Sequence, residues 1–428
     1  MRRPVSRRPA LFALVALAIV LGAASCTPPA PVTITVEGQV LGYAVAPAGG
    51  IVVQTQGRTT VTDGAGRFTL TGVRTPYDLV LAAASGAQWI HVFEGLTSAE
   101  PRLDPWRAVG VGFSPATAPV SGTVLGGPLP AGRRVVLCLE ADDVVVIGCT
   151  AVEPGGGAYS MDANWLAVGA VEARLRALRV VVDGNGLPTA YEGHVVVDVT
   201  LVPGVPLVQD LLLGPAPGVV PATVDIEVPA GTLASIAFIS VRTSDRSMLR
   251  IAGPVTVAGP LSWPAPALGD GELTVLYGAQ SPPNSAFGWA QGPADGLAPI
   301  RVGVAPQMLQ PLTGATGVDG STTFRVAAPA GEVITYRWTV VGGPRLARTT
   351  TRTEVTMPDP ADAGFVVPAG ADAWWNAIGH GTITVEAAAA LASDAALIVL
   401  VELGLHVALP ASGAQARSWD DRTFVLAP

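Results

Sequence analysis

One short pattern occurs twice in this chain of 428 residues, and it limits the fold to strands joined by tight turns. The segment VEGQVLGYAVAPAGGIVV from Val36 matches VSGTVLGGPLPAGRRVVL from Val120, and both contain V-x-G-x-V-L-G before a Pro-Ala-Gly turn. A second shared block aligns DGAGRFTL from Asp63 with PGGGAYSM from Pro154. Alternating apolar residues are typical of half-buried strands. The repeat therefore predicts two related β units.

Pro-Ala-Gly turns predict further units along the chain. They begin at Pro47, Pro130, Pro229 and Pro329, so they are 83, 99 and 100 residues apart. Proline fixes φ at the first inner turn position and glycine accepts positive φ, which suits a reversal between antiparallel strands. The spacing is that of immunoglobulin-sized sandwiches. We expect an all-β chain of tandem β-sandwich modules at 34–115, 118–214, 220–304 and 314–428.

The first module resembles the carboxypeptidase regulatory-like domain, a small transthyretin-like sandwich, over residues 34–97. The block TDGAGRF carries most of this resemblance. Asp63 can hydrogen-bond the backbone of the turn, Gly66 can adopt the left-handed conformation, and Phe68 is expected in the core. Further matching residues are Gly38, Val40, Pro47 to Val53, Thr62, Tyr77 and Leu79. The resemblance implies a fold and an accessory, non-catalytic role.

The C-terminal half gives weaker signals. Tyr336 and Trp338 alternate with polar residues, as in a central strand of immunoglobulin-like or fibronectin-like sandwiches, where a core Trp is common. The apolar run 397–409 is interrupted by Glu402 and His406, so it fits a half-buried strand better than a membrane segment. Two segments, from Val171 and from Val385, have the composition of short helices.

The N-terminus has the layout of an export signal. Four arginines precede an apolar run of about 16 residues, too short for the roughly 20 that span a bilayer, and the run ends at Cys26. The stretch 1–26 resembles a bacterial lipoprotein signal, which implies acylation of Cys26, with 27–33 as a linker. Ala23 stands where Leu is usual, so ordinary cleavage without lipidation is the alternative; Ser6, Arg7 and Arg8 also resemble a twin-arginine start.

The charge balance argues against nucleic-acid partners. The basic residues are 25 arginines and no lysine, against 33 acids, for a net charge of −8. Phosphate binding depends on clustered basic side chains. Arg133 and Arg134 are adjacent, and we interpret them as flanking a strand.

Proline-containing linkers are stiff, so we expect the modules to extend as a string.

No catalytic, cofactor or metal site is expected. His91, His194, His380 and His406 lack the spacing of a helical metal motif, and no G-x-S-x-G, P-loop or Rossmann pattern occurs in the right context. Aspartates at Asp63, Asp183 and Asp270 fit hairpin turns better than calcium loops. The neighbouring pairs Asp142–Asp143 and Asp420–Asp421 fit solvated turns. Trp374 and Trp375 could form a platform on which a sugar stacks. The alternative is that one of the two lies in the core and the other caps a loop.

The two remaining cysteines predict a disulfide. A two-residue turn at Asp143 and Val144 places Cys138 directly opposite Cys149, because each cysteine lies five positions from the turn. Export favours oxidation, and a buried dithiol is the alternative.

Together these features predict a lipid-anchored, non-catalytic protein of the cell envelope, at the outer membrane or cell surface. It would contact the membrane through its N-terminal anchor and engage a protein or glycan partner. A carbohydrate-binding module array is one alternative, and an enzyme with a site built from distant residues is another.

We expect Cys26→Ala to abolish membrane anchoring, because stable anchoring by this class depends on acyl chains at that cysteine. Detergent phase separation of the expressed full-length chain measures the partition, and the variant should move from the detergent phase to the aqueous phase. Unchanged partition would remove the lipoprotein assignment.

Overall fold

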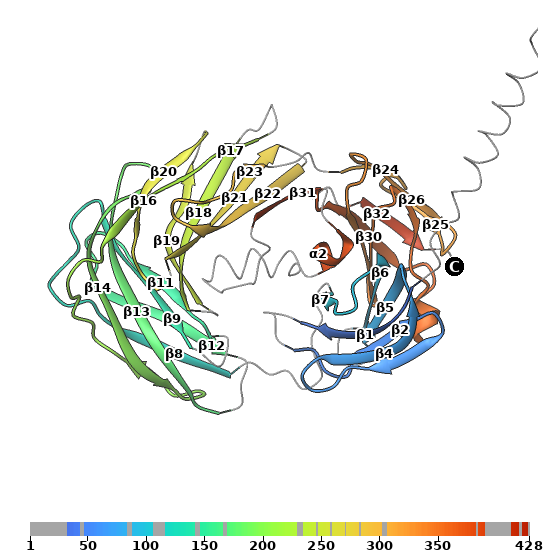
Figure 1. Cartoon of the computed structure of the whole chain (residues 1–428), viewed down its shortest axis with the longest axis horizontal. Helices are drawn as coiled ribbons and strands as arrows, with labels where there is room; N and C mark the ends of the chain where they lie inside the picture. The colour runs from blue at the N-terminus through green and yellow to red at the C-terminus, as the bar shows by residue number, and fades with distance from the viewer. Residues whose placement is uncertain are drawn as a thin grey trace, which may run out of the picture.

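The computed structural model of this chain (Figure 1) is nearly all β. It describes residues 32–42, 47–83, 88–105, 116–141, 146–165, 169–228, 234–244, 247–256, 259–269, 271–281, 284–301, 306–381, 384–389, 412–418 and 422–426. The strands form several sheets, which confirms the all-β fold class. Among the described residues, helical turns are confined to η2 (Pro360–Ala363) and α2 (Val385–Ala389).

The first module is a sandwich of two sheets over one core. One sheet has the order β4-β1-β7. The other has the order β6-β5-β2-β3 and forms one end of a longer sheet. Val36, Phe68 and Leu81 are buried between them. The strands are β1 (Thr33–Val40), β2 (Val52–Thr55), β3 (Arg58–Val61), β4 (Arg67–Arg74), β5 (Tyr77–Ala83), β6 (Trp89–Leu96) and β7 (Arg102–Leu103).

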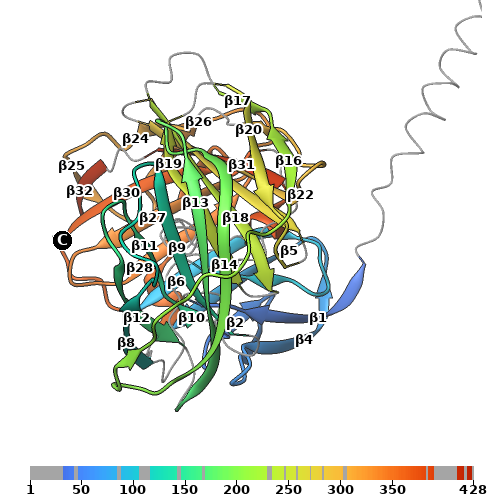
Figure 2. The ribbon, with the colours of Figure 1, turned by 90° about the vertical axis from the view of Figure 1, so that its left-hand side faces the viewer.

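The second module repeats this plan with several longer strands, and Figure 2 views it face-on. Its sheets have the orders β10-β12-β8-β15 and β11-β9-β13-β14. The strands are β8 (Ala116–Thr123), β9 (Arg133–Glu140), β10 (Val146–Ile147), β11 (Cys149–Val152), β12 (Ala158–Trp165), β13 (Val171–Val182), β14 (Pro188–Leu201) and β15 (Leu207–Val208).

The internal repeat is visible in the pairing of these strands. Gly38 lies opposite Phe68 in the first module, and the aligned Gly122 lies opposite Tyr159 in the second. Glycine at position 38 leaves room for Phe68, because a Cβ there would lie 2.3 Å from the Phe68 ring.

The turns of the repeat also correspond. The Val40 amide donates to the Gly66 carbonyl oxygen at 2.8 Å, and the aligned Val124 amide donates to the Gly157 oxygen at 2.8 Å. In both modules a short strand, β7 or β15, then pairs in parallel with the opening strand. Aligned positions thus occupy equivalent places in the two modules.

The third module packs on the second through a shared core. Val136 and Leu178 of the second module lie in one apolar cluster with Ile239 and Leu249 of the third. The strands are β16 (Val219–Val224), β17 (Ile226–Glu227), β18 (Ala234–Ser244), β19 (Ser247–Thr256), β20 (Leu261–Pro266), β21 (Glu272–Ser281), β22 (Asn284–Pro293) and β23 (Ile300–Arg301).

The fourth module encloses an aromatic core. Phe324 meets the rings of Trp338 and Trp375 edge-on, at 5.2 Å between centroids in each case. Tyr336 and Trp338 are fully buried on β27, which lies between β28 and β30. The strands are β24 (Gln307–Gln310), β25 (Ala315–Val318), β26 (Thr323–Ala327), β27 (Ile334–Val340), β28 (Arg345–Thr350), β29 (Glu354–Thr356), β30 (Asp372–Gly379), β31 (Ser412–Ser418) and β32 (Arg422–Leu426).

The modules are not an extended string. β31 pairs with β22 and β30, and β28 pairs with β6, so one sheet of 14 strands joins the third, fourth and first modules. Figure 1 shows the first and fourth modules side by side. The proline-containing segments between modules are partly strand: β8 begins at Ala116 and β24 occupies 307–310. Pairing between modules therefore outweighs the stiffness of proline-containing segments. The division into modules at 34–115, 118–214, 220–304 and 314–428 stays a prediction.

The helix expected from Val171 is wrong, because this segment is β13. Its Ala, Leu and Arg residues favour helices, but Ala173, Leu175 and Ala177 alternate into the core while β13 pairs with both β9 and β14. Tertiary pairing overrides the local preference.

We expect Gly66→Ala to destabilise the first module far more than Gly57→Ala. Both residues have positive φ, 70° and 75°, which costs an alanine about 1 to 2 kcal/mol. A Cβ at Gly66 would also lie 2.3 Å from the Val40 carbonyl oxygen, whereas Gly57 faces open space. Displacing that backbone adds about 1 to 3 kcal/mol. Urea unfolding of the two variants compares them, and equal losses would contradict the predicted clash.

Candidate functional site: the polar junction of the first and fourth modules

The first and fourth modules meet where β6 pairs in parallel with β28. The register runs from Trp89 opposite Arg345 to Phe93 opposite Thr349. All of β6 except Gly95 is buried, as expected for a strand covered on both faces. This strand nevertheless carries His91 and Glu94. Buried polar groups need partners, and both find them on the fourth module.

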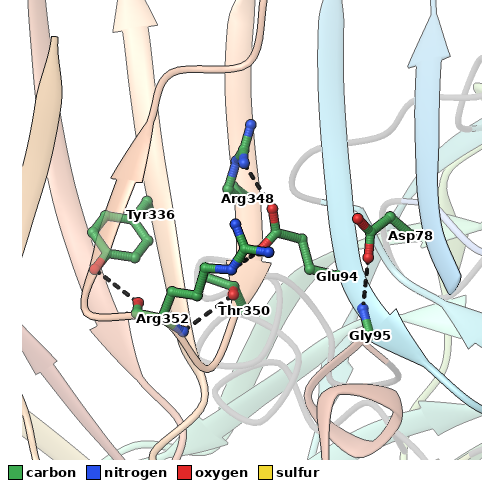
Figure 3. Close-up of polar contacts among 7 residues, drawn as sticks. All are labelled: Asp78, Glu94, Gly95, Tyr336, Arg348, Thr350 and Arg352. Atoms are coloured by element: carbon green, nitrogen blue, oxygen red, sulfur yellow. Dashed lines mark hydrogen bonds and ion pairs between the residues drawn. The ribbon is translucent and has the colours of Figure 1, made fainter. Parts of the chain in front are cut away.

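On one face of the sheet, Glu94 is held by two arginines (Figure 3). Its carboxylate lies 2.7 Å from the Arg348 Nη1 and 3.5 Å from the Arg352 Nε. The side chains of Glu94 and Arg348 are only 9% and 16% exposed, so water screens this pair weakly. The Tyr336 hydroxyl donates to the Arg352 carbonyl oxygen at 3.0 Å and fixes the end of β28.

Asp78 anchors β6 within the first module. Its carboxylate accepts a hydrogen bond from the Gly95 amide at 2.9 Å, next to Glu94 in the chain (Figure 3). Near Glu94, strand β6 is thereby held by the first module as well as by the fourth.

On the opposite face, a line of hydrogen bonds crosses three strands. The His91 Nε2 lies 2.8 Å from the Thr349 hydroxyl, which lies 2.8 Å from the Thr335 hydroxyl. The Thr335 hydroxyl is also 2.8 Å from the His380 Nε2. Burial, together with the nearby His380 and Arg337, lowers the pKa of His91 to about 3. His91 is therefore neutral at ordinary pH and acts here as a hydrogen-bonding group.

Helix α2 covers this face of the junction. The Glu386 carboxylate accepts from the Thr97 amide, from the Thr97 hydroxyl at 2.9 Å and from the Ser98 amide at 3.3 Å. The Asp104 amide donates to the Ala389 carbonyl oxygen at 2.6 Å. The fourth module thus contacts the first through a helix as well as through a strand.

Glu332 is a buried carboxyl beside this network. It is 3% exposed, and burial raises its pKa to about 7, against a smaller lowering by a hydrogen bond from the Gly381 backbone. A Cβ on Gly379 would lie 2.1 Å from the Glu332 Oε1, so glycine makes room for the carboxyl. The pKa of Glu332 therefore lies near neutral pH.

The predicted cysteine pair adopts the expected register. Cys149 lies opposite Cys138 in the β11–β9 ladder, with 4.1 Å between Cα atoms and 2.12 Å between sulfurs. The sulfurs are thus at bonding distance, and oxidation in the exported protein stays a prediction. The turn at Asp143, and Cys26 with its signal, lie outside the described residues.

Asp63 and Asp183 serve turns. The Asp63 carboxylate accepts from the amides of Ala65 and Arg67, and the Asp183 carboxylate accepts from those of Asn185 and Leu187, at 2.8 to 2.9 Å. Because these carboxylate oxygens accept hydrogen bonds from their own turns, the contacts favour a structural role in the turn over calcium binding. Asp270, Asp142, Asp420, Asp421, His406 and the strand expected at 397–409 lie outside the described part of the chain.

The other candidate residues lie apart from one another. Trp375 is fully buried and Trp374 half-buried, so this pair is not an exposed sugar platform. His194 lies on β14, 3.1 Å from the Arg176 Nη1, and Arg176 in turn pairs with the buried Glu140 at 2.8 Å. In the described residues no three His, Cys, Asp or Glu side chains are grouped to hold a metal.

Sequence reasoning missed Glu94, Arg348 and Glu332. Glu94 was detectable in part, because it interrupts the apolar strand WIHVF-E-GL. The identity of its partners depends on a pairing between residues 254 positions apart.

Comparisons with known proteins add little. No protein family model matches the sequence, and no curated protein does. Among solved structures, the chain is similar to the Bacillus anthracis TIE protein over 63% of this chain and 49% of that one, at 10% identity and a TM-score of 0.15. The chain thus spans about half the length of that structure. So low a TM-score assigns no function, and the resemblance to regulatory-like and immunoglobulin-like domains stays a prediction. No described helix is long and apolar enough to cross a bilayer.

We expect Glu332→Gln to stabilise the protein above pH 7. The folded pKa of about 7 lies above the ordinary value of 4.5, so folding favours the protonated carboxyl. The protonated Glu332 therefore contributes fully to the stability of the folded state below pH 4.5, and this contribution is lost as pH rises through about 7. The neutral amide avoids that loss, which amounts to about 3 kcal/mol at most. Thermal unfolding between pH 5 and 8 measures the effect. Exposed Glu354→Gln is the control, and equal pH profiles for both variants would contradict the assignment.

Proposed function

We propose that this protein is a lipid-anchored, non-catalytic component of the cell envelope, a rigid β scaffold that engages protein or glycan partners at the cell surface. The carrying observation is the junction between β6 and β28, where buried charges connect the first module to the fourth. Support for the location is the N-terminal basic and apolar stretch ending at Cys26. The opposed cysteines of β9 and β11 fit an oxidising compartment.

The junction favours one arrangement of the modules. Removing a carboxylate from water costs several kcal/mol unless good partners replace the solvent. Glu94 meets Arg348 and Arg352 in the observed register. A slip of one residue would turn each side chain of β6 to the opposite face. Glu94 would then face the side that carries the His91 network. We infer that the polar groups specify the register more than they add stability.

A rigid arrangement suits a protein that binds. Fixed modules lose little conformational freedom on association, so more of the contact energy appears as affinity. The buried histidines support a non-catalytic role, because His91 and His380 are 4% and 6% exposed and hydrogen-bond to threonines inside the junction. A carbohydrate-binding array would be favoured by exposed coplanar aromatic rings, and the Trp374–Trp375 pair does not supply them.

We expect Glu94→Gln to separate the first module from the fourth. The substitution leaves Arg348, 16% exposed, without its charged partner, and breaking such a pair costs about 3 kcal/mol or more. Calorimetry should resolve an early transition absent from the parent, and small-angle scattering should show a larger maximum dimension.

The matched control is Glu192→Gln. Glu192 also lies 2.7 Å from an arginine, Arg133, but both side chains are about a third exposed, at 31% and 35%. Surface pairs contribute little, so one transition and the parental dimension are expected. A Glu94→Gln protein that behaves like this control would overturn the rigid scaffold.

A further inference from the structure

A cavity of about 90 Å³ lies between the second and third modules, against the cysteine pair. Cys138 and Ala252 in its wall are buried, whereas Ala151 and Glu153 are exposed. The cavity therefore runs from the surface toward the core. Cys138 on β9 and Cys149 on β11 lie opposite each other and form part of one wall. Its charged side chains come from both modules: Arg134, Glu153 and Arg250.

Arg134 spans the two modules. Its Nη2 donates to the carbonyl oxygen of Ile251 on β19 at 3.2 Å, across 117 residues of chain. Its Nε is buried and has no hydrogen-bond partner among the described residues. Burial lowers the pKa of Arg134, Glu153 opposes this, and the nearby Arg250 lowers it further. A buried donor without an acceptor is costly, and an acceptor in the cavity would relieve that cost.

Arg250 brings a second positive charge to the cavity. Its guanidinium carbon lies 5.9 Å from the centroid of the Phe238 ring, a distance at which the aromatic face attracts a cation. Two arginines therefore line the cavity with a single, exposed carboxylate, Glu153. Two of the three charged side chains that line the cavity are therefore cationic, although the whole chain carries −8.

We propose that this cavity binds a small oxyanion between Arg134 and Arg250. Guanidinium groups match the oxygens of carboxylates and phosphates with paired hydrogen bonds. A water needs about 15 Å³ of such space, so the cavity has room for roughly six waters, or for an anion of phosphate or acetate size. Nucleotides and oligosaccharides are too large to enter whole. The bound anion would join the two modules, because only the folded chain brings the arginines together.

Anion-dependent unfolding of the full-length protein in detergent tests this site. Phosphate and acetate are titrated separately, in an amine buffer that contains no oxyanion. Sodium chloride keeps the ionic strength constant. A ligand that binds only the folded state raises the unfolding temperature in a saturable way. We expect this with at least one of the two oxyanions and not with chloride. Phosphate alone would identify a tetrahedral anion, acetate alone a carboxylate, and both a general oxyanion site.

Matched variants locate the site. Arg134→Gln and Arg250→Gln should weaken binding about tenfold or more, since each removes a charge-assisted hydrogen bond. Arg133→Gln should not, because Arg133 pairs instead with Glu192. Glu153→Gln should tighten binding by removing the competing carboxylate, a gain that misfolding cannot imitate. Circular dichroism checks the fold of each variant, and if Arg134→Gln does not fold, the other variants decide.

Two results would overturn the proposal. One is the lack of any saturable shift beyond that of chloride with either oxyanion. The other is equal weakening by Arg133→Gln and Arg250→Gln, which would indicate general screening of surface charge.

Discussion

The parallel pairing of β6 with β28 decides how the rest of the molecule is arranged. It joins the first module to the fourth, so a chain of consecutive modules turns back on itself. Parallel pairs need long connections, and here the second and third modules form that connection. The pairing buries Glu94 and His91 on opposite faces of one sheet. Each finds its partner only in the observed register, which makes the junction specific.

The same use of buried charge recurs inside the second module. Glu140 is 2% exposed and lies between Arg174 and Arg176, at 3.2 and 2.8 Å. In both places a carboxylate near the end of an apolar strand meets arginines that lie on the neighbouring strand or just after it. The absence of lysine is consistent with this role, because the planar guanidinium satisfies a buried carboxylate with several hydrogen bonds.

Two kinds of junction therefore connect the modules. The first and fourth share a sheet, and polar groups hold them in register. The second and third share an apolar core that includes Val136 and Ile239, and the cavity beside it gathers Arg134 and Arg250. Apolar packing tolerates small shifts better than a buried ion pair does, because it has no directional requirement. The polar junction is accordingly the stricter of the two.

The sequence by itself determined the all-β class, the repeat and the cysteine register. These follow from local alternation and from turn chemistry, as the correspondence of Gly38–Phe68 with Gly122–Tyr159 illustrates. Only the tertiary structure decided which modules touch. Glu94 finds Arg348 across 254 residues, and no local pattern encodes that distance. The segment from Val171 makes the same point, because its helical preference yielded to pairing with two neighbours. Non-local pairing outweighs local preference because it buries apolar area and satisfies backbone groups on both edges of a strand.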